Sequence, residues 1–203
     1  MYYKILGVNG QPHHGGTGLW SLPQDDQAGE WMPEITDIAL CQRGYHFLTR
    51  EQLVIWLGPE IYEVEVRGTI LSDTDKSVAS EARLIKRLYA DTWNEITARL
   101  FAADCAEHVL NIFEQIYPQD DRPRNAIRAA RDFARGTIDS AAQSAAQSAA
   151  QSAARSAASS AAWSAAQSTS WSASWSAAWS ASWSAVRKTQ TDNLFEYLDG
   201  TRN

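Results

Sequence analysis

Residues 61–68 read Ile-Tyr-Glu-Val-Glu-Val-Arg-Gly, and this stretch decides the fold class of the first half of the chain. Tyr62, Val64 and Val66 alternate with charged side chains along it. Because successive side chains of a strand point to opposite faces of a sheet, this period of two predicts a strand with one buried face. Gly68 closes the alternation, so we expect the strand to end there.

The sequence on both sides of this strand predicts a small sheet and one short helix. Thr49 and Gln52 have the three-residue spacing of a capping box, which predicts the start of a helix. Further strands are expected at residues 2–6, 35–41 and 78–88, the last with the alternative of running into a helix. We therefore predict an α+β fold in which residues 1–90 form a domain with a small, mostly antiparallel sheet.

The hydrophobic period changes after residue 91, where apolar side chains begin to recur every three to four residues. This spacing predicts an amphipathic helix over residues 92–117, which Pro118 ends. Asp121 and Pro123 are cap and first-turn signals for a second helix, and Gly136 is its stop. Residues 91–203 are therefore predicted to be an all-α, Ala/Ser-rich domain that closes with a short amphipathic helix over residues 192–198.

A tetrapeptide repeat of the form Ser-Ala-Ala-X occupies the segment 140–187. Alanine favours helix, and the repeat contains no glycine or proline to break it. Four residues advance about 400° in a helix, so the X side chains form a stripe that winds slowly, with a period that favours right-handed packing. We expect the helix to fold back once near residues 168–170, with a disordered tail, a silk-like sheet and an ice-binding helix as alternatives. Homo-oligomers through this helix are a further possibility.

Charge and cysteine content narrow the classes of function. All of the net charge of −6 lies in residues 1–98, which hold fourteen acidic and eight basic side chains, so binding to nucleic acid is not expected. The start of the chain lacks the pattern of a secretory signal, and two cysteines are few for a secreted domain. A cytoplasmic location, with no membrane partner, is the expectation.

Four arginines and five tryptophans are the candidate partner-binding residues. The arginines are spaced by four, three and four residues, which places them on one helix face, opposite Ile127 and Phe133, where they suit an acidic protein surface or a phosphorylated ligand. The alternative is a solvated face in which they pair with Asp120, Asp121, Asp132 and Asp139. The tryptophans either fill the core of a helical hairpin or are exposed binding anchors. These residues are Arg124, Arg128, Arg131, Arg135, Trp163, Trp171, Trp175, Trp179 and Trp183.

Three other groups of residues have a chemical interpretation and a structural one. The glycine-rich loop 7–18, with His13 and His14, either approaches a phosphate through its backbone or is a hairpin-like loop. Cysteine and histidine occur at Cys41, His46, Cys105 and His108, where they are either zinc ligands with unusual spacing or ordinary core and loop residues. Tyr45 and His46 with Glu63 or Glu65 have the residue types of an ADP-ribosyl-transferring pocket. We expect no metal, no cofactor and no catalytic residue.

Residues 121–131 read Asp-Arg-Pro-Arg-Asn-Ala-Ile-Arg-Ala-Ala-Arg, and Ala134-Arg135-Gly136 and an alanine-rich repeat follow. This pattern resembles immunity proteins of bacterial polymorphic-toxin systems over residues 99–203. The resemblance implies a non-enzymatic protein that neutralises a toxin or effector by binding it. The first 90 residues resemble a domain of bacterial and phage proteins. The resemblance is carried by residues 14–16, 29–31 and 41–46. The alternatives are a ligand-sequestering protein of phage or bacterial defence and an ADP-ribosyl-transfer-like enzyme.

Overall fold

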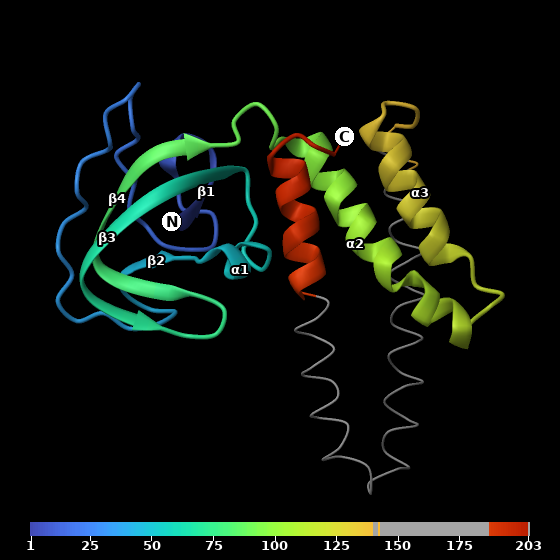
Figure 1. Ribbon diagram of the computed structural model, residues 1–203, viewed down its shortest axis with the longest axis horizontal. Helices are drawn as coiled ribbons and strands as arrows, with labels where there is room; N and C mark the ends of the chain where they lie inside the picture. Colours follow the sequence, from blue (N-terminus) through green and yellow to red (C-terminus); the bar gives the residue numbers. More distant parts are fainter. Residues whose placement is uncertain (140–141, 143–186, 203) are drawn as a thin grey trace, which may run out of the picture. The chain divides into compact units, whose positions relative to one another are not determined.

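The computed structural model describes residues 1–139, 142 and 187–202 of the chain. Two compact units emerge from the contacts between residues. The first comprises Met1–Asn94 together with Arg187–Arg202, and the second comprises Glu95–Val186. Figure 1 shows a curved sheet in the first unit and a pair of helices in the second, so the predicted α+β class is confirmed. The predicted repeat hairpin lies outside the described residues.

Four antiparallel strands form the sheet of the first unit, in the order β1-β3-β4-β2. Tyr3 and Leu48 exchange two backbone hydrogen bonds of 2.9 Å, which brings the edge strand β1 to the end of the other edge strand, β2. The sheet therefore curls almost into a closed barrel, as the bend of its long strands in Figure 1 shows. The elements of this unit are β1 (Tyr2–Leu6), η1 (Val8–Gly10), β2 (Tyr45–Phe47), α1 (Arg50–Leu53), β3 (Glu60–Ser72) and β4 (Ser77–Leu88).

The predicted burial pattern of β3 is confirmed. Tyr62 and Val64 are buried in the core of the curled sheet, and Val66 packs against that core. The strand nevertheless continues past Gly68 to Ser72, so its predicted end was wrong. Gly68 has a φ of 78°, and a Cβ there would overlap the Oγ of Ser80. A β-bulge at this glycine bends the strand and shifts its register without ending it.

The second predicted strand, residues 35–41, was also wrong, because β2 lies at Tyr45–Phe47. Residues 29–35 run along the edge of β4 beyond β2, and Ile35 N–H donates to the carbonyl of Ser80 at 3.0 Å. The chain then turns back on itself through paired bonds between Ala39 and Arg43 of 2.8 and 2.9 Å. Residues 36–41 therefore form a turn that follows the segment along the edge of β4, and they pair with no strand.

The predicted helix start at Thr49 is confirmed. Gln52 Oε1 accepts a bond of 3.0 Å from the Thr49 N–H, and helix α1 follows directly. The strand over residues 78–88 is confirmed as β4, without a helical continuation.

The C-terminal helix, described over residues 187–198, belongs to the first unit. Its buried side chains include Leu194, Phe195 and Leu198, and the Phe195 ring meets the Tyr3 ring edge-on at 6.1 Å. Arg50 stacks on the same phenyl ring at 3.4 Å. The predicted helix is confirmed, whereas the predicted division into residues 1–90 and 91–203 placed it with the helical part of the chain. The apolar side chains of this short helix predict that one face is buried, but they do not show which part of the chain buries it.

Two helices make up the described part of the second unit, α2 (Glu95–Ile116) and α3 (Arg122–Ala134), as predicted. The short connection between them turns the chain back, and Figure 1 shows the two helices side by side. Their contact is formed by the buried side chains of Ala103, Leu110 and Ile127, with Ala130 packed against them. This small core holds the arginine-bearing helix in a defined register on α2.

Candidate functional site

The four predicted arginines all line one groove between α3 and α2, with a volume of about 400 Å³. Arg124, Arg128 and Arg131 belong to α3, and Arg135 caps its C-terminal end. The same groove contains Glu107 and Leu110 from α2 and Ile127 and Asp132 from α3. We call it the arginine groove. The prediction that the arginines share one face is thus met in space, but Ile127 lies beside them, not opposite them. At 100° per residue, position 127 is only about 40° from position 131 around the helix.

Arg131 is the most firmly held of the four. Its guanidinium donates to Asp104 at 2.6 Å and to both carboxylate oxygens of Glu107 at 2.6 and 3.1 Å. The hydrogen bond from Arg131 lowers the pKa of Glu107, and the same contacts raise the pKa of Arg131. Only 23% of the Arg131 side chain and 9% of the Asp104 side chain are exposed. Arg131 therefore serves to join the two helices.

Arg124 also reaches across to α2, where its guanidinium forms a bidentate pair with Glu114 through bonds of 2.6 and 2.8 Å. This pair lies nearer to solvent, since 55% of the Arg124 side chain is exposed. Arg124 and Arg131 thus follow the antiparallel register of the helices, the former near the turn and the latter farther along. Two of the four arginines therefore stabilise the helix pair.

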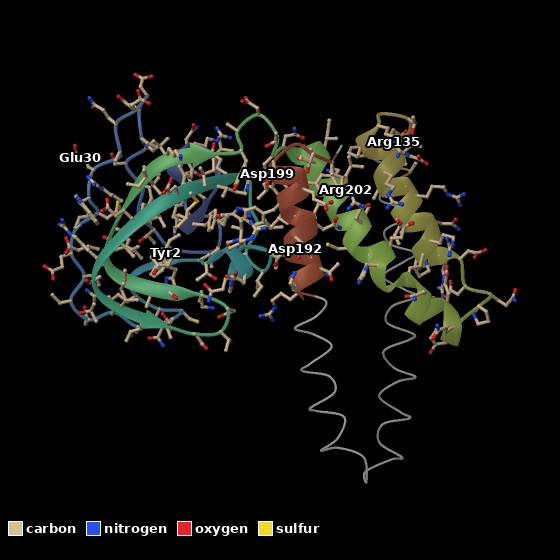
Figure 2. The ribbon with its side chains drawn as sticks, in the orientation of Figure 1. Tyr2, Glu30, Arg135, Asp192, Asp199 and Arg202 are labelled. Carbon is tan, nitrogen blue, oxygen red and sulfur yellow. The ribbon has the colours of Figure 1, made fainter. Side chains whose placement is uncertain are left out.

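Arg128 and Arg135 differ from the other two because, among the described residues, their polar contacts are to side chains of α3 and not of α2. Arg128 donates to the side-chain amide of Asn125, and Arg135 lies 4.0 Å from Asp132, at the limit of an ion pair. The Arg135 side chain is 65% exposed, and Figure 2 shows it near the C-terminal end of α3. Each of these guanidinium groups has donors left for a partner.

The alternative pairing predicted for the arginines is met only in part. Asp132 does contact Arg135, but Asp120 pairs with Arg122 at 2.6 Å, and that hydrogen bond lowers the pKa of Asp120. The acids of α2 are the main partners. Sequence reasoning missed Asp104, Glu107 and Glu114, although aligning the two helices as an antiparallel hairpin would have placed acids opposite Arg124 and Arg131. The five predicted tryptophans of the repeat lie outside the described residues.

The cysteines and histidines weighed as zinc ligands fall into different units, since Cys41 and His46 belong to the first and Cys105 and His108 to the second. Both cysteines are free thiols. Among the residues that the structure describes, no three histidine, cysteine or acidic side chains are grouped as metal ligands.

The possible catalytic set of Tyr45 and His46 with Glu63 or Glu65 is not assembled. Tyr45 and His46 line a cavity of the first unit, and neither glutamate does. Glu65 pairs with Arg83 at 2.7 Å, and Glu63 lies 3.6 Å from Lys86, both on the sheet. The carboxylate that would orient a ribose hydroxyl is therefore not in this cavity.

The part of the chain that contains the arginine groove matches the model of a protein family. Residues 90–178 match the model of a family described as "Imm-5 like putative immunity protein". The matched part contains α2, α3 and all four arginines. No curated protein and no solved structure matches the chain. No helix among the described residues is long and apolar enough to cross a membrane. For residues 90–178, the match supports the resemblance to immunity proteins seen in the sequence.

Proposed function

We propose that this chain is an immunity-like protein that neutralises a toxin or effector protein by binding to it directly. The family match of residues 90–178 is the observation that carries the proposal. Neutralisation by binding requires a complementary surface and no catalytic group. This requirement agrees with a helix pair on which charged side chains are presented along one groove.

The arginine groove is the surface that we assign to this contact. Arg124 and Arg131 hold the two helices together, so their guanidinium groups keep the groove in shape. Arg128 and Arg135 offer their remaining donors, and the groove residues carry four arginines against the two acids Glu107 and Asp132. A partner with an acidic patch would form charge-assisted hydrogen bonds here, which are among the stronger polar contacts at an interface.

A binding measurement with charge-neutralised variants tests this assignment. The partner would be a toxin whose killing the full chain prevents on co-expression. In the double variant Arg128→Gln/Arg135→Gln, we expect affinity for that toxin to fall at least about tenfold at low salt. We also expect a smaller loss at high salt, since salt screens exposed charges. Surface plasmon resonance over a salt series measures both effects.

The matched control is Lys86→Gln/Lys188→Gln, which removes the same amount of charge from the first unit. These lysine side chains are 58% and 79% exposed, and each makes an ion pair like those of the groove. Equal losses in the two double variants would show that the toxin responds only to net charge. Unchanged affinity in the groove variant would refute the assignment of the groove. Failure of the full chain to protect against any toxin with which it is co-expressed would count against the proposed function itself.

A further inference from the structure

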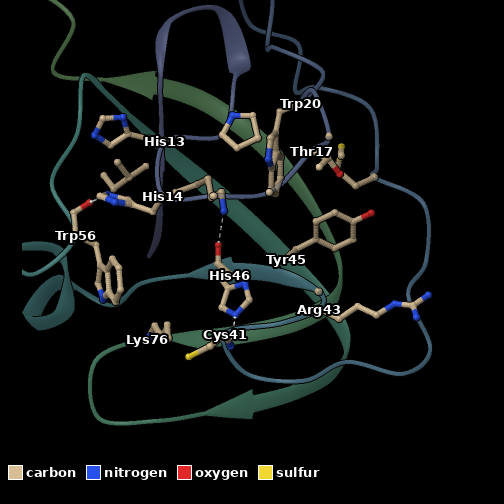
Figure 3. A pocket seen from close by; sticks show the side chains of 18 of the residues that line it. His13, His14, Thr17, Trp20, Cys41, Arg43, Tyr45, His46, Trp56 and Lys76 are labelled. Carbon is tan, nitrogen blue, oxygen red and sulfur yellow. Dashed lines mark hydrogen bonds between the residues drawn. The ribbon is translucent and has the colours of Figure 1, made fainter.

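The first unit contains a cavity of about 620 Å³ that the proposed function does not use. Two segments far apart in the sequence meet there, the glycine-rich loop residues 12–18 and residues 41–46 (Figure 3). Loop residues 13–18 and residues 41–43 are exposed and form the rim, whereas Ile5 and Trp20 are buried in the wall. Segments that the sequence offered as separate motifs therefore form a single site.

Lys4 carries a positive charge in the wall of this cavity. Its ammonium donates a hydrogen bond of 2.8 Å to the backbone carbonyl of His46 and lies 5.0 Å from the centre of the Trp20 ring. Neither group neutralises a charge, and burial lowers the pKa of Lys4 to about 8. Figure 3 shows the bond to His46 as a dashed line. A bound anion would relieve the cost of holding this charge in a partly buried position.

Two more cations line the same cavity. Lys76 lies over the Trp56 ring at 4.4 Å, and Arg43 stands at the rim with 60% of its side chain exposed. Each of them also contacts one aspartate, Asp75 at 3.2 Å and Asp37 at 2.7 Å, respectively. Neither aspartate lines the cavity, and no carboxylate occurs among the described residues that do. Every charged side chain of this wall is therefore basic.

Three histidines also line the cavity, and a ring nitrogen of His14 already bonds to the carbonyl of Trp56 at 2.9 Å. His46 Nε2 accepts a bond of 2.9 Å from the Cys41 N–H, and its pKa is lowered by burial and then by Lys4 and Lys76. His13 and His14 lie at the rim with ring centres 4.6 Å apart. Burial, together with His14, lowers the pKa of His13. Protonation of these rings would be favoured by an anion between them.

The remaining wall is suited to the organic part of a ligand. Apolar or aromatic side chains line the cavity beside the cations, and its volume falls within the range of about 300–1,000 Å³ that is typical of small-molecule sites. A lone inorganic ion would leave most of this space unused. The apolar lining residues are Ile5, Trp20, Met32, Ile35, Leu48 and Trp56.

We propose that this cavity binds a small organic phosphate, with the phosphate beside Lys4, the cations Lys76 and Arg43 adding positive charge to the same wall, and the organic part against the apolar wall. Lys4 brings a charge that no described carboxylate pairs with, and Lys76 and Arg43, each paired with one aspartate, keep further donors, so the wall suits a doubly charged phosphate better than a single carboxylate. The glycine-rich loop adds backbone at the rim, where Gly15 and Gly16 have φ values of 93° and 101°. Glycine at these positions allows a ligand to approach the main chain closely.

Isothermal titration of the full chain tests the chemistry of the ligand. The probes are adenosine 5′-monophosphate, adenosine, inorganic phosphate and citrate. We expect the nucleotide to bind at least about tenfold more tightly than adenosine or inorganic phosphate, because it alone fills both parts of the site. Tighter binding of citrate than of the nucleotide would overturn the assignment of a phosphate ester. Absence of binding by the nucleotide up to millimolar concentration would overturn the proposal.

Two variants locate the binding in the cavity. Lys4→Met should weaken nucleotide binding at least about tenfold, because a hydrogen bond to a charged group is lost. Arg43→Gln should weaken it several-fold, and we expect folding to be intact because the side chain is 60% exposed. Lys86→Gln, which changes charge outside the cavity, is the control and should bind as the unchanged chain does. Equal affinity in the Arg43 variant and the control, with folding intact, would refute the site.

The pH dependence gives a second readout that does not require a variant. Phosphate esters stay doubly charged above a pKa of about 6, so changes above pH 7 report on the protein. Lys4 loses its charge as the pH rises through about 8. Of its neighbours in the wall, the pKa of Lys76 and that of Tyr45 are raised, while His46 and His13 have lowered values and are neutral in this range. The other titratable or charged groups of the wall are His14, Arg43 and Cys41, so the titration is repeated with Cys41→Ser to separate the thiol from Lys4. Affinity should therefore fall about tenfold or more between pH 7 and 9.5, and a constant affinity would contradict the role of Lys4.

Discussion

Replacing Arg131 with alanine removes the guanidinium that joins α3 to Asp104 and Glu107 of α2. Water can replace the lost hydrogen bonds easily at Glu107, which is 51% exposed, but poorly at Asp104, which is 9% exposed. Loss of a charge-assisted hydrogen bond at a buried carboxylate costs about 1.5–3 kcal/mol. Solvent near the guanidinium moderates this cost, so we expect the second unit to lose about 2 kcal/mol of stability.

Arg124→Ala is the matched comparison, because it removes a bidentate bond to an acid of the same helix. Its side chain is 55% exposed, and exposed ion pairs contribute about 0–1 kcal/mol. Hydrogen exchange of the amides in α2 and α3, read by mass spectrometry, reports the local opening free energy of this helix pair. Equal losses of protection in the two variants would refute the reasoning, since Arg131 differs from Arg124 in its burial and in its bond to the buried Asp104.

Two further predictions concern the bulge and the pH dependence of the helix pair. Gly68→Ala should lower the stability of the first unit by about 1–3 kcal/mol, because the new Cβ would overlap Ser80 Oγ in a left-handed backbone, and a chemical denaturation curve measures the loss. Glu107 has a lower pKa in the folded chain than the unfolded value of 4.5. Its ionised form therefore adds to the folding stability of the second unit above pH 4.5, and this stability is lost as the pH falls through the folded pKa. Circular dichroism across an acid titration should show helix loss in that range, and Glu107→Gln should make the curve less steep.

Elements marked by a strong local signal could be predicted from the sequence. Alternation over residues 61–66 located β3, and the spacing of Thr49 and Gln52 located α1. Residues 35–41 misled because their alternation is local, whereas strand pairing depends on residues distant in sequence: only Ile35 bonds to β4, and the chain then turns between Ala39 and Arg43. The continuation of β3 past Gly68 depended on the Oγ of Ser80, another distant group.

The candidate sites were predictable to different degrees. The arginine stripe followed from spacing on one helix, whereas the acids that bind two of its members belong to α2 and needed the register of the helix pair. Lys4 could not be recognised from the sequence as a binding residue, because a lysine in a short edge strand is ordinary. Its role depends on the fold, which places its ammonium beside the His46 carbonyl and the Trp20 ring. Local patterns thus identified side chains along one element, and they failed where two segments meet.

Residues 187–202, which contain the C-terminal helix, complete a unit whose other residues precede position 95. During synthesis, more than ninety residues are added after Asn94 before the C-terminal helix is made. The face of the first unit that contains Tyr3 therefore stays uncovered until then. The first unit cannot reach its final stability before the last part of the described chain leaves the ribosome. A chain that stops within the repeat would keep the arginine-bearing helices and yet expose an aromatic surface, a substrate for proteases and chaperones.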